Sequence, residues 1–162
     1  MRYTAKENVL PEDAQLRQSL EEVVKGLGFK LVELAVSRHR GSVQVKAVIY
    51  NGASIGTDDC SKVHRAVTPR LELAFAGQEI RLEVSSPGID RLIKDGYEFT
   101  HYTGKGVRLY IPGISDWTAG VLESADEKGI VLKKKNGVER LEFENIAKAK
   151  LDGSLSGFTQ EV

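Results

Sequence analysis

The sequence predicts an α+β protein of two domains, an N-terminal two-helix, three-stranded mixed-sheet domain at residues 1–91 and an all-β small barrel at residues 92–162. In the first part, two helical patterns alternate with strand patterns. Beyond residue 88 the pattern changes to short strands spaced about ten residues apart. Hydrophobic residues make up 41% and charged residues 28% of the chain, values typical of proteins that bury a core.

Two amphipathic helices are expected in the first domain. The first covers residues 14–27, where apolar residues recur at spacings of three and four. The second begins near Thr57, where two aspartates follow as the acidic residues that a first turn favours. Pro69 removes a backbone donor and clashes with the preceding turn, so we expect this helix to bend or end near residue 68.

Three segments of the first domain, 29–36, 43–50 and 80–85, alternate between apolar and polar residues. The first two are separated by a short basic stretch and predict a hairpin, with Arg38, His39 and Arg40 in its turn. The order helix, strand, strand, helix, strand lets both helices cover one face of a three-stranded mixed sheet.

Five short strands are expected in the second domain, at residues 106–111, 118–124, 130–134, 139–143 and 146–151. Asn136-Gly137 is a strong hairpin signal between two of them. Residues 144–146 match the short 3₁₀ turn before the last strand of SH3-like (Sm-like) barrels. We therefore expect a small closed barrel of this type.

Composition excludes several kinds of function. The chain has 23 basic and 23 acidic residues, so any nucleic-acid binding must come from a local patch. Cys60 is the single cysteine and the three histidines are far apart, so we expect no cofactor and no metal. The apolar runs are far shorter than the roughly 20 residues needed to cross a bilayer, and no signal peptide follows Met1, so we expect a cytoplasmic protein.

Residues 82–91, Leu-Glu-Val-Ser-Ser-Pro-Gly-Ile-Asp-Arg, resemble the signature of the ribosome maturation factor RimP family. Residues 58–66 resemble the second helix of that family, and 120–122 and 146–151 resemble its barrel strands. Leu92 stands where the family usually has proline, which predicts a less rigid connection. The resemblance implies a non-enzymatic factor that matures the small (30S) subunit by binding the immature particle through rRNA and a ribosomal protein.

The first group of candidate site residues is the domain-junction motif, which consists of Ser85, Ser86, Pro87, Gly88, Asp90 and Arg91. One interpretation is structural, with the serines bonding backbone groups and Pro-Gly making a turn. The other is functional, with Asp90 and Arg91 either locking the domains together or presenting the arginine to rRNA.

The second group consists of candidate rRNA contacts, namely Arg38, Arg40, Arg65 and Arg70. Cationic side chains on a turn and on an exposed helix face can approach phosphates. An ordinary solvated charge run is the alternative.

The third group consists of candidate ribosomal-protein contacts, namely Tyr110, Trp117, Glu123, Asp126 and Glu127. Acidic residues at a barrel edge suit a basic ribosomal protein, and tryptophan is enriched at interaction hot spots. Core packing is the alternative for the two aromatic residues.

Two binding functions and one catalytic function can be compared. The leading hypothesis is a monomeric assembly factor of the small subunit. The second is a general RNA chaperone or Sm-like RNA-binding regulator, which would bind many RNAs and form a ring. An enzyme is the third, and the sequence offers no phosphate loop or acid-base pair for it.

Overall fold

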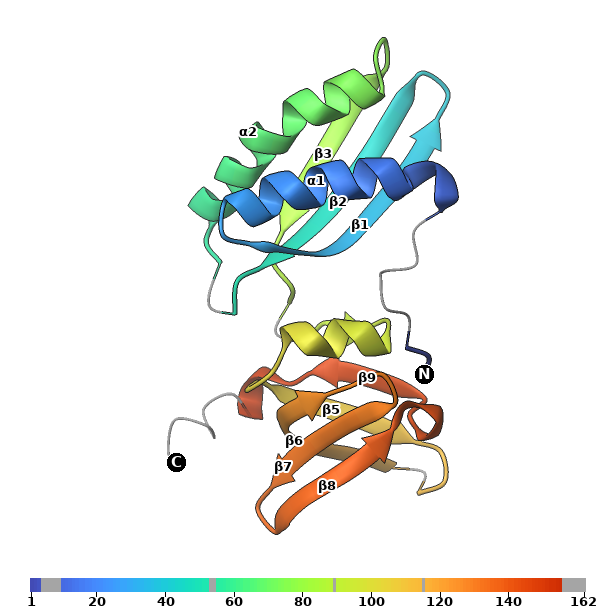
Figure 1. Cartoon of the computed structure of the whole chain (residues 1–162), viewed down its shortest axis with the longest axis vertical. Coiled ribbons are helices and arrows are strands. Elements are labelled where there is room, and N and C mark those ends of the chain that lie inside the picture. Colours follow the sequence, from blue (N-terminus) through green and yellow to red (C-terminus); the bar gives the residue numbers. More distant parts are fainter. Residues whose placement is uncertain (4–9, 53–54, 89, 115, 156–162) are drawn as a thin grey trace. The chain divides into compact units, whose positions relative to one another are not determined.

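The computed structural model describes residues 1–3, 10–52, 55–88, 90–114 and 116–155 (Figure 1). The described residues form two compact units. Residues 10–87 make the first unit, and residues 88–155 together with residues 1–3 make the second. The first combines helices with a mixed sheet and the second is built mainly from antiparallel strands, so the predicted α+β class is confirmed.

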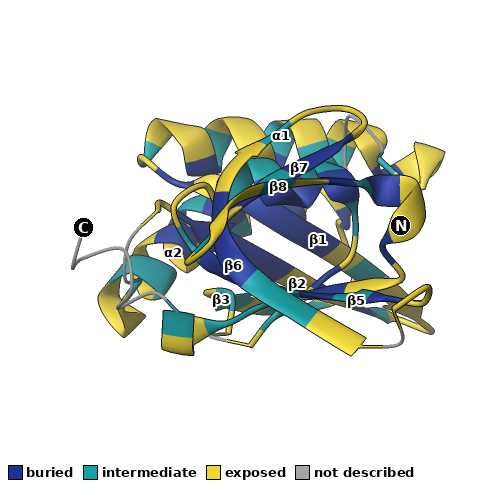
Figure 2. Cartoon of the chain, turned by 90° about the horizontal axis from the view of Figure 1, so that it is seen from below, coloured by how far each residue is buried: buried dark blue, intermediate teal, exposed yellow. Residues whose placement is uncertain are grey.

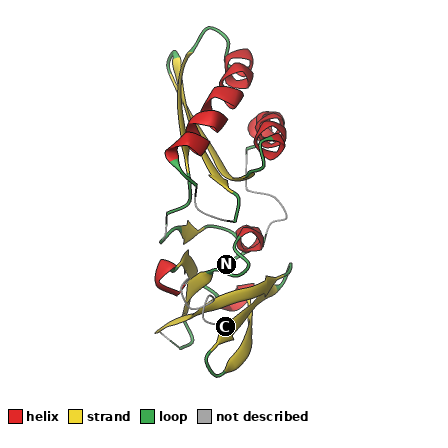
Figure 3. Cartoon of the chain, turned by 90° about the vertical axis from the view of Figure 1, so that its left-hand side faces the viewer, coloured by secondary structure: helices red, strands yellow, loops and turns green. Residues whose placement is uncertain are grey.

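The first unit has two helices on one face of a three-stranded sheet, as Figure 3 shows. Strand β2 lies in the middle, antiparallel to β1 and parallel to β3. This is the predicted mixed sheet. The elements in order are η1 (Pro11–Asp13), α1 (Ala14–Gly26), β1 (Lys30–His39), β2 (Ser42–Tyr50), α2 (Thr57–Ala74) and β3 (Glu79–Ser85).

The core of the first unit lies between the helices and the sheet. Leu20 and Val24 of α1 and Leu71 of α2 are almost completely buried, because helical spacing places them on the faces turned toward the strands. Strand β2 contributes alternate residues, Val43, Val45, Ala47 and Ile49, and β1 contributes Leu31 and Leu34, which lie on the two sides of a register shift.

Helix α2 does not end near residue 68, so that alternative was wrong, while a bend at Pro69 stays a prediction. It continues through Pro69 to Ala74. The proline costs one backbone hydrogen bond, but the residues beyond it bury Leu71 completely and Phe75 almost completely in the core. Helix stability in proteins comes mostly from such packing, which here outweighs the local cost.

The hairpin turn between β1 and β2 is shorter than predicted. Arg38 and His39 still belong to β1 and pair with Val43 and Ser42. Only Arg40 and Gly41 make the turn, and Gly41 has a positive φ of 78°, which favours glycine. Of the three basic residues expected at the tip, Arg40 alone is there.

The second unit is a six-stranded antiparallel sheet with the order β4-β9-β5-β6-β7-β8. Among the described residues no ladder joins β8 to β4, so closure into a barrel is not detected. The elements are β4 (Leu92–Ile93), η2 (Gly96–His101), β5 (Gly106–Ile111), β6 (Asp116–Ala125), β7 (Gly129–Lys134), β8 (Gly137–Glu142), η3 (Phe143–Asn145) and β9 (Lys148–Leu151).

Two of these elements were not expected from the sequence. Strand β4 has only two residues, too few to show alternation. The 3₁₀ segment η2 supplies Phe99, which is fully buried, and it is followed directly by Tyr102, also fully buried. These two rings fill the middle of the second unit together with the buried faces of the strands.

The boundary between the two compact units lies between Pro87 and Gly88, and residues 1–3 belong to the second unit. The ring of Tyr3 stacks on Phe143 at 5.8 Å, and the amide of Gly96 donates to the carbonyl of Arg2. These contacts tie residues 1–3 to the second unit. The domain limits 1–91 and 92–162 stay a prediction.

Burial differs among the strands of the second unit, since β5 and β7 are more buried than β8 (Figure 2). Strand β6 begins with exposed residues and passes to buried ones in its middle.

In the described part of the chain, no helix has the length and apolarity that crossing a membrane would require.

Candidate functional site

The junction motif begins as strand and ends as a turn. Ser85 is the last residue of β3 and pairs with Val48. The amide of Arg91 donates to the carbonyl of Gly88 at 3.1 Å, which closes a turn at the start of the second unit. That turn covers residues 88–91, and the interpretation of Pro87-Gly88 itself as a turn stays a prediction. The locking role of Asp90 stays a prediction.

Arg91 is held inside the second unit. Its guanidinium bonds the carboxylate of Glu98, and these two side chains are only 10% and 7% exposed. The same carboxylate accepts hydrogen bonds from the amide of Lys94 at 3.1 Å and from the hydroxyl of Tyr102 at 2.9 Å. Burial and the neighbouring carboxylate raise the pKa of Tyr102 far above its ordinary value, so the hydroxyl stays a donor.

Sequence reasoning missed Glu98 and Tyr102 as partners of the signature arginine. They lie on η2 and directly after it, an element that the sequence pattern did not reveal. The one local signal for this contact is the four-residue spacing between Glu98 and Tyr102. That spacing is common in helices generally.

Arg38 and Arg70 of the candidate rRNA contacts line one groove of about 790 Å³ in the first unit. The hydrogen bond with Asp13 raises the pKa of Arg38, and the guanidinium also lies 5.6 Å from the centre of the Phe75 ring. Arg70 donates to the hydroxyl of Ser19 at 2.8 Å. The groove also contains Glu12 and Asp13, so its charges balance.

Arg40 and Arg65 lie elsewhere in the first unit. Arg40 is exposed in the hairpin turn. Arg65 lines a separate pocket of about 410 Å³ together with Cys60, His64 and Val84. The four arginines therefore do not form a single patch.

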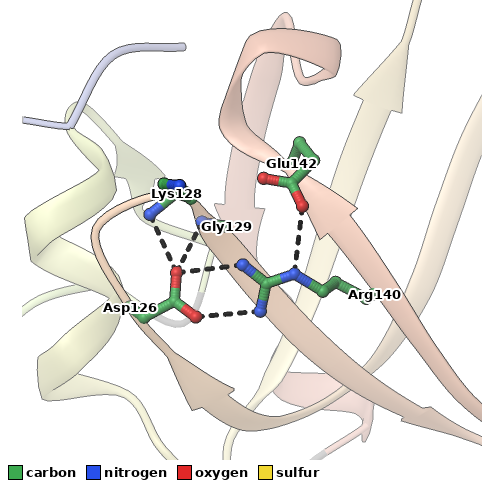
Figure 4. Close-up of polar contacts among 5 residues, drawn as sticks. All are labelled: Asp126, Lys128, Gly129, Arg140 and Glu142. Atoms are coloured by element: carbon green, nitrogen blue, oxygen red, sulfur yellow. Dashed lines mark hydrogen bonds and ion pairs between the residues drawn. The ribbon is translucent and has the colours of Figure 1, made fainter.

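Asp126, from the acidic candidates of the second unit, is saturated with hydrogen bonds (Figure 4). Arg140 donates to both of its carboxylate oxygens at 2.8 and 3.1 Å, and the amides of Lys128 and Gly129 donate at 2.8 and 3.0 Å. Arg140 and the two amides hold the pKa of this carboxyl well below its ordinary range. Asp126 thus organises the β6–β7 loop, while Glu123 and Glu127 remain exposed.

Tyr110 and Trp117 pair across β5 and β6, with ring centres 5.5 Å apart. Trp117 is 37% exposed, so the chain's single tryptophan does not fill the core. The ammonium of Lys150 lies 5.2 Å from the centre of its ring. Sequence reasoning missed Lys150 as a neighbour, because strand order is not readable from the pattern.

Groups that could hold a metal ion were not found among the described residues. Cys60 is half-buried and free of any disulfide, and burial raises the pKa of its thiol. A raised pKa leaves the thiol protonated and weakly nucleophilic at neutral pH.

A family model described as the RimP N-terminal domain matches residues 19–90. A protein of Borrelia hermsii named ribosome maturation factor RimP is 29% identical over 86% of this chain and 96% of its own length. Proteins of the same name from Borrelia recurrentis and Borrelia turicatae are each 26% identical, over 88% and 86% of the chain and over 97% and 96% of their own lengths.

The chain belongs to the RimP family. The matched segment, 19–90, covers most of the first unit and ends on the junction motif. The similarity to whole RimP proteins continues into the second unit, since the aligned regions are longer than the first unit alone. The RimP signature Ser-Ser-Pro-Gly followed by Asp-Arg therefore marks the point in this structure where one unit passes into the next.

Proposed function

We propose that this chain matures the small (30S) ribosomal subunit by binding its immature form, without catalysing a reaction. The observation that carries the proposal is the similarity, along 96–97% of their lengths, to relatives named ribosome maturation factor. The RimP family consists of non-enzymatic assembly factors. A cytoplasmic location and a monomeric state belong to the same proposal.

A binding protein can promote assembly by acting on an equilibrium. If it binds one conformer of the maturing particle more tightly than the others, it shifts the population toward that conformer by no more than the difference in affinity. Release follows when the matured particle no longer fits.

We assign the rRNA contacts to the first unit. Arg40, in an exposed turn, and Arg65, on the exposed side of α2, are the strongest members of the group. Arg38 and Arg70 are engaged by Asp13 and Ser19, so they contribute less to phosphate binding unless these bonds are exchanged.

We assign the ribosomal-protein contact to the acidic loop that follows β6. Glu127 is exposed in this loop, Glu123 is exposed near the end of β6, and Asp126 fixes the loop between them and β7. Ribosomal proteins that bind rRNA are basic, and complementary charge steers such partners together.

Gradient sedimentation of a lysate tests the proposal. The protein should travel with small-subunit particles and leave them when salt is raised, because phosphate contacts are salt-sensitive. Migration with free RNA of many sizes would favour the general RNA chaperone. Migration with neither would refute both.

A further inference from the structure

One outer face of the second unit carries aromatic and cationic side chains from neighbouring strands. Side chains alternate along a strand, so cross-strand partners share a face. One row of partners across β4, β9, β5 and β6 consists of Leu92, Lys150, Arg108 and Ala119. The next row, across β9, β5 and β6, consists of Lys148, Tyr110 and Trp117. We call this surface the aromatic-cationic face.

The aromatic part of this face is open to solvent. Trp117 is 37% exposed and Leu92 is 55% exposed, while Tyr110 is half-buried. The rings of Tyr110 and Trp117 are tilted by 57°, so they present two adjoining surfaces. Exposed rings beside each other are the usual platform on which unpaired bases stack.

The charges on this face are mainly positive. Lys148 is exposed, and Lys150 lies over the tryptophan ring. Arg108 bonds Asp152 at 2.8 and 3.0 Å, which leaves this pair neutral. Asp116, at the start of β6, accepts a hydrogen bond from the amide of Trp117. Lys148 is the cross-strand partner of Tyr110 and Lys150 lies over Trp117, so both lysines adjoin the aromatic pair.

We propose that the aromatic-cationic face binds single-stranded RNA. Trp117 and Tyr110 stack on successive bases, while Lys148 and Lys150 contact the phosphates between them. The sequence placed both rings with the acidic candidates as ribosomal-protein contacts. In the fold they are separated, since Trp117 lies at the beginning of β6 and Asp126 follows its end. A basic protein would meet two lysines on this face, whereas RNA meets complementary charge.

The inference deepens the proposed function, because it adds an RNA-binding surface on the second unit to the one assigned to the first. It requires unpaired RNA, since the bases of a duplex are not available for stacking. Immature ribosomal RNA contains such segments before its helices and tertiary contacts have formed.

The single tryptophan allows a direct measurement on the full-length protein. Titration with oligouridylate or oligoadenylate of about twelve nucleotides should quench the fluorescence of Trp117, because a base stacks on the indole. A duplex of the same length should quench it less. An unchanged fluorescence with the single strands, or quenching by a lysine- and arginine-rich peptide in their place, overturns the proposal.

Variants separate this face from general electrostatic attraction. With a fluorescein-labelled strand, Trp117→Ala should weaken binding about tenfold and Trp117→Phe much less, because the smaller ring still stacks. Lys148→Ala/Lys150→Ala should reduce the slope of log affinity against log salt by about 1.4. The matched control, Lys25→Ala/Lys128→Ala, removes two exposed lysines outside the face and should leave the affinity close to wild type.

Equal losses in the control and in the Lys148/Lys150 variant would overturn the proposal. Circular dichroism and thermal unfolding of each variant establish that it is folded. Sedimentation of wild-type protein with small-subunit particles is measured separately. If it persists while RNA fails to quench Trp117, this inference is wrong and the proposed function stands.

Discussion

Arg91 and Glu98 form an ion pair that is almost completely buried in the second unit. They are seven positions apart in sequence, and the pair ties the end of the junction motif to η2. The signature arginine therefore has a structural role that can be measured independently of any partner.

Replacing Arg91 with alanine should lower the free energy of unfolding of the second unit by about 3 kcal/mol, because Glu98 would remain buried without its countercharge. Urea unfolding followed by the fluorescence of Trp117 measures this loss. The control is Lys134→Ala, whose pair with Glu139 is more exposed, at 28% and 44% of the two side chains, and should cost less than about 1 kcal/mol. Equal costs would contradict the structural role.

Gly129→Ala should destabilise the second unit by at least about 2 kcal/mol, because the strands must move apart to accept the methyl group. An added Cβ would lie 2.3 Å from the carbonyl oxygen of Leu141. Gly113→Ala is the matched control, since nothing lies within 4 Å of its added Cβ. Thermal unfolding of both variants checks the difference, and a stable Gly129→Ala protein would show that β7 and β8 are not this close.

The carboxyl of Asp126 should titrate below the ordinary aspartate pKa of about 3.9. Its pKa is lowered in the folded chain, so its stabilising contribution is complete above that ordinary pKa and is lost as the pH falls through the folded value. Carbon NMR of the side-chain carboxyl measures the midpoint. Arg140→Ala should move the midpoint up toward the ordinary value, since Arg140 is the largest cause of the shift. A midpoint that Arg140→Ala leaves in place would rule out that cause.

Arg40→Ala should reduce the salt slope of binding to immature small subunits by about 0.9, the change expected for one lost contact with a duplex phosphate. Arg38→Ala should change it less, because Asp13 already holds this guanidinium. Binding measured at several salt concentrations distinguishes the two. A larger effect of Arg38→Ala would mean that its bond to Asp13 opens on binding.

Local patterns predicted most of the fold. Helical spacing located both helices, and alternation located all strands longer than two residues. The exceptions depend on packing. Pro69 stays inside α2 because Leu71 and Phe75 beyond it are needed in the core, and the two residues of β4 are a strand only because β9 lies beside them.

The candidate site was predicted less completely. The junction motif was readable from its residues, and so were the exposed arginines as a class. The partners were not, since Lys150 reaches Trp117 only because the strand order is β9, β5, β6. Charge alone likewise did not reveal that Asp126 is saturated by Arg140 and two amides.

The central claim is that this chain recognises the immature small subunit. Purified protein mixed with equal amounts of immature and mature small subunits, and then pelleted through a sucrose cushion, tests it most directly. The account predicts clear retention on the immature particles and weak retention on the mature ones. Equal retention on both, or none on either, would contradict it.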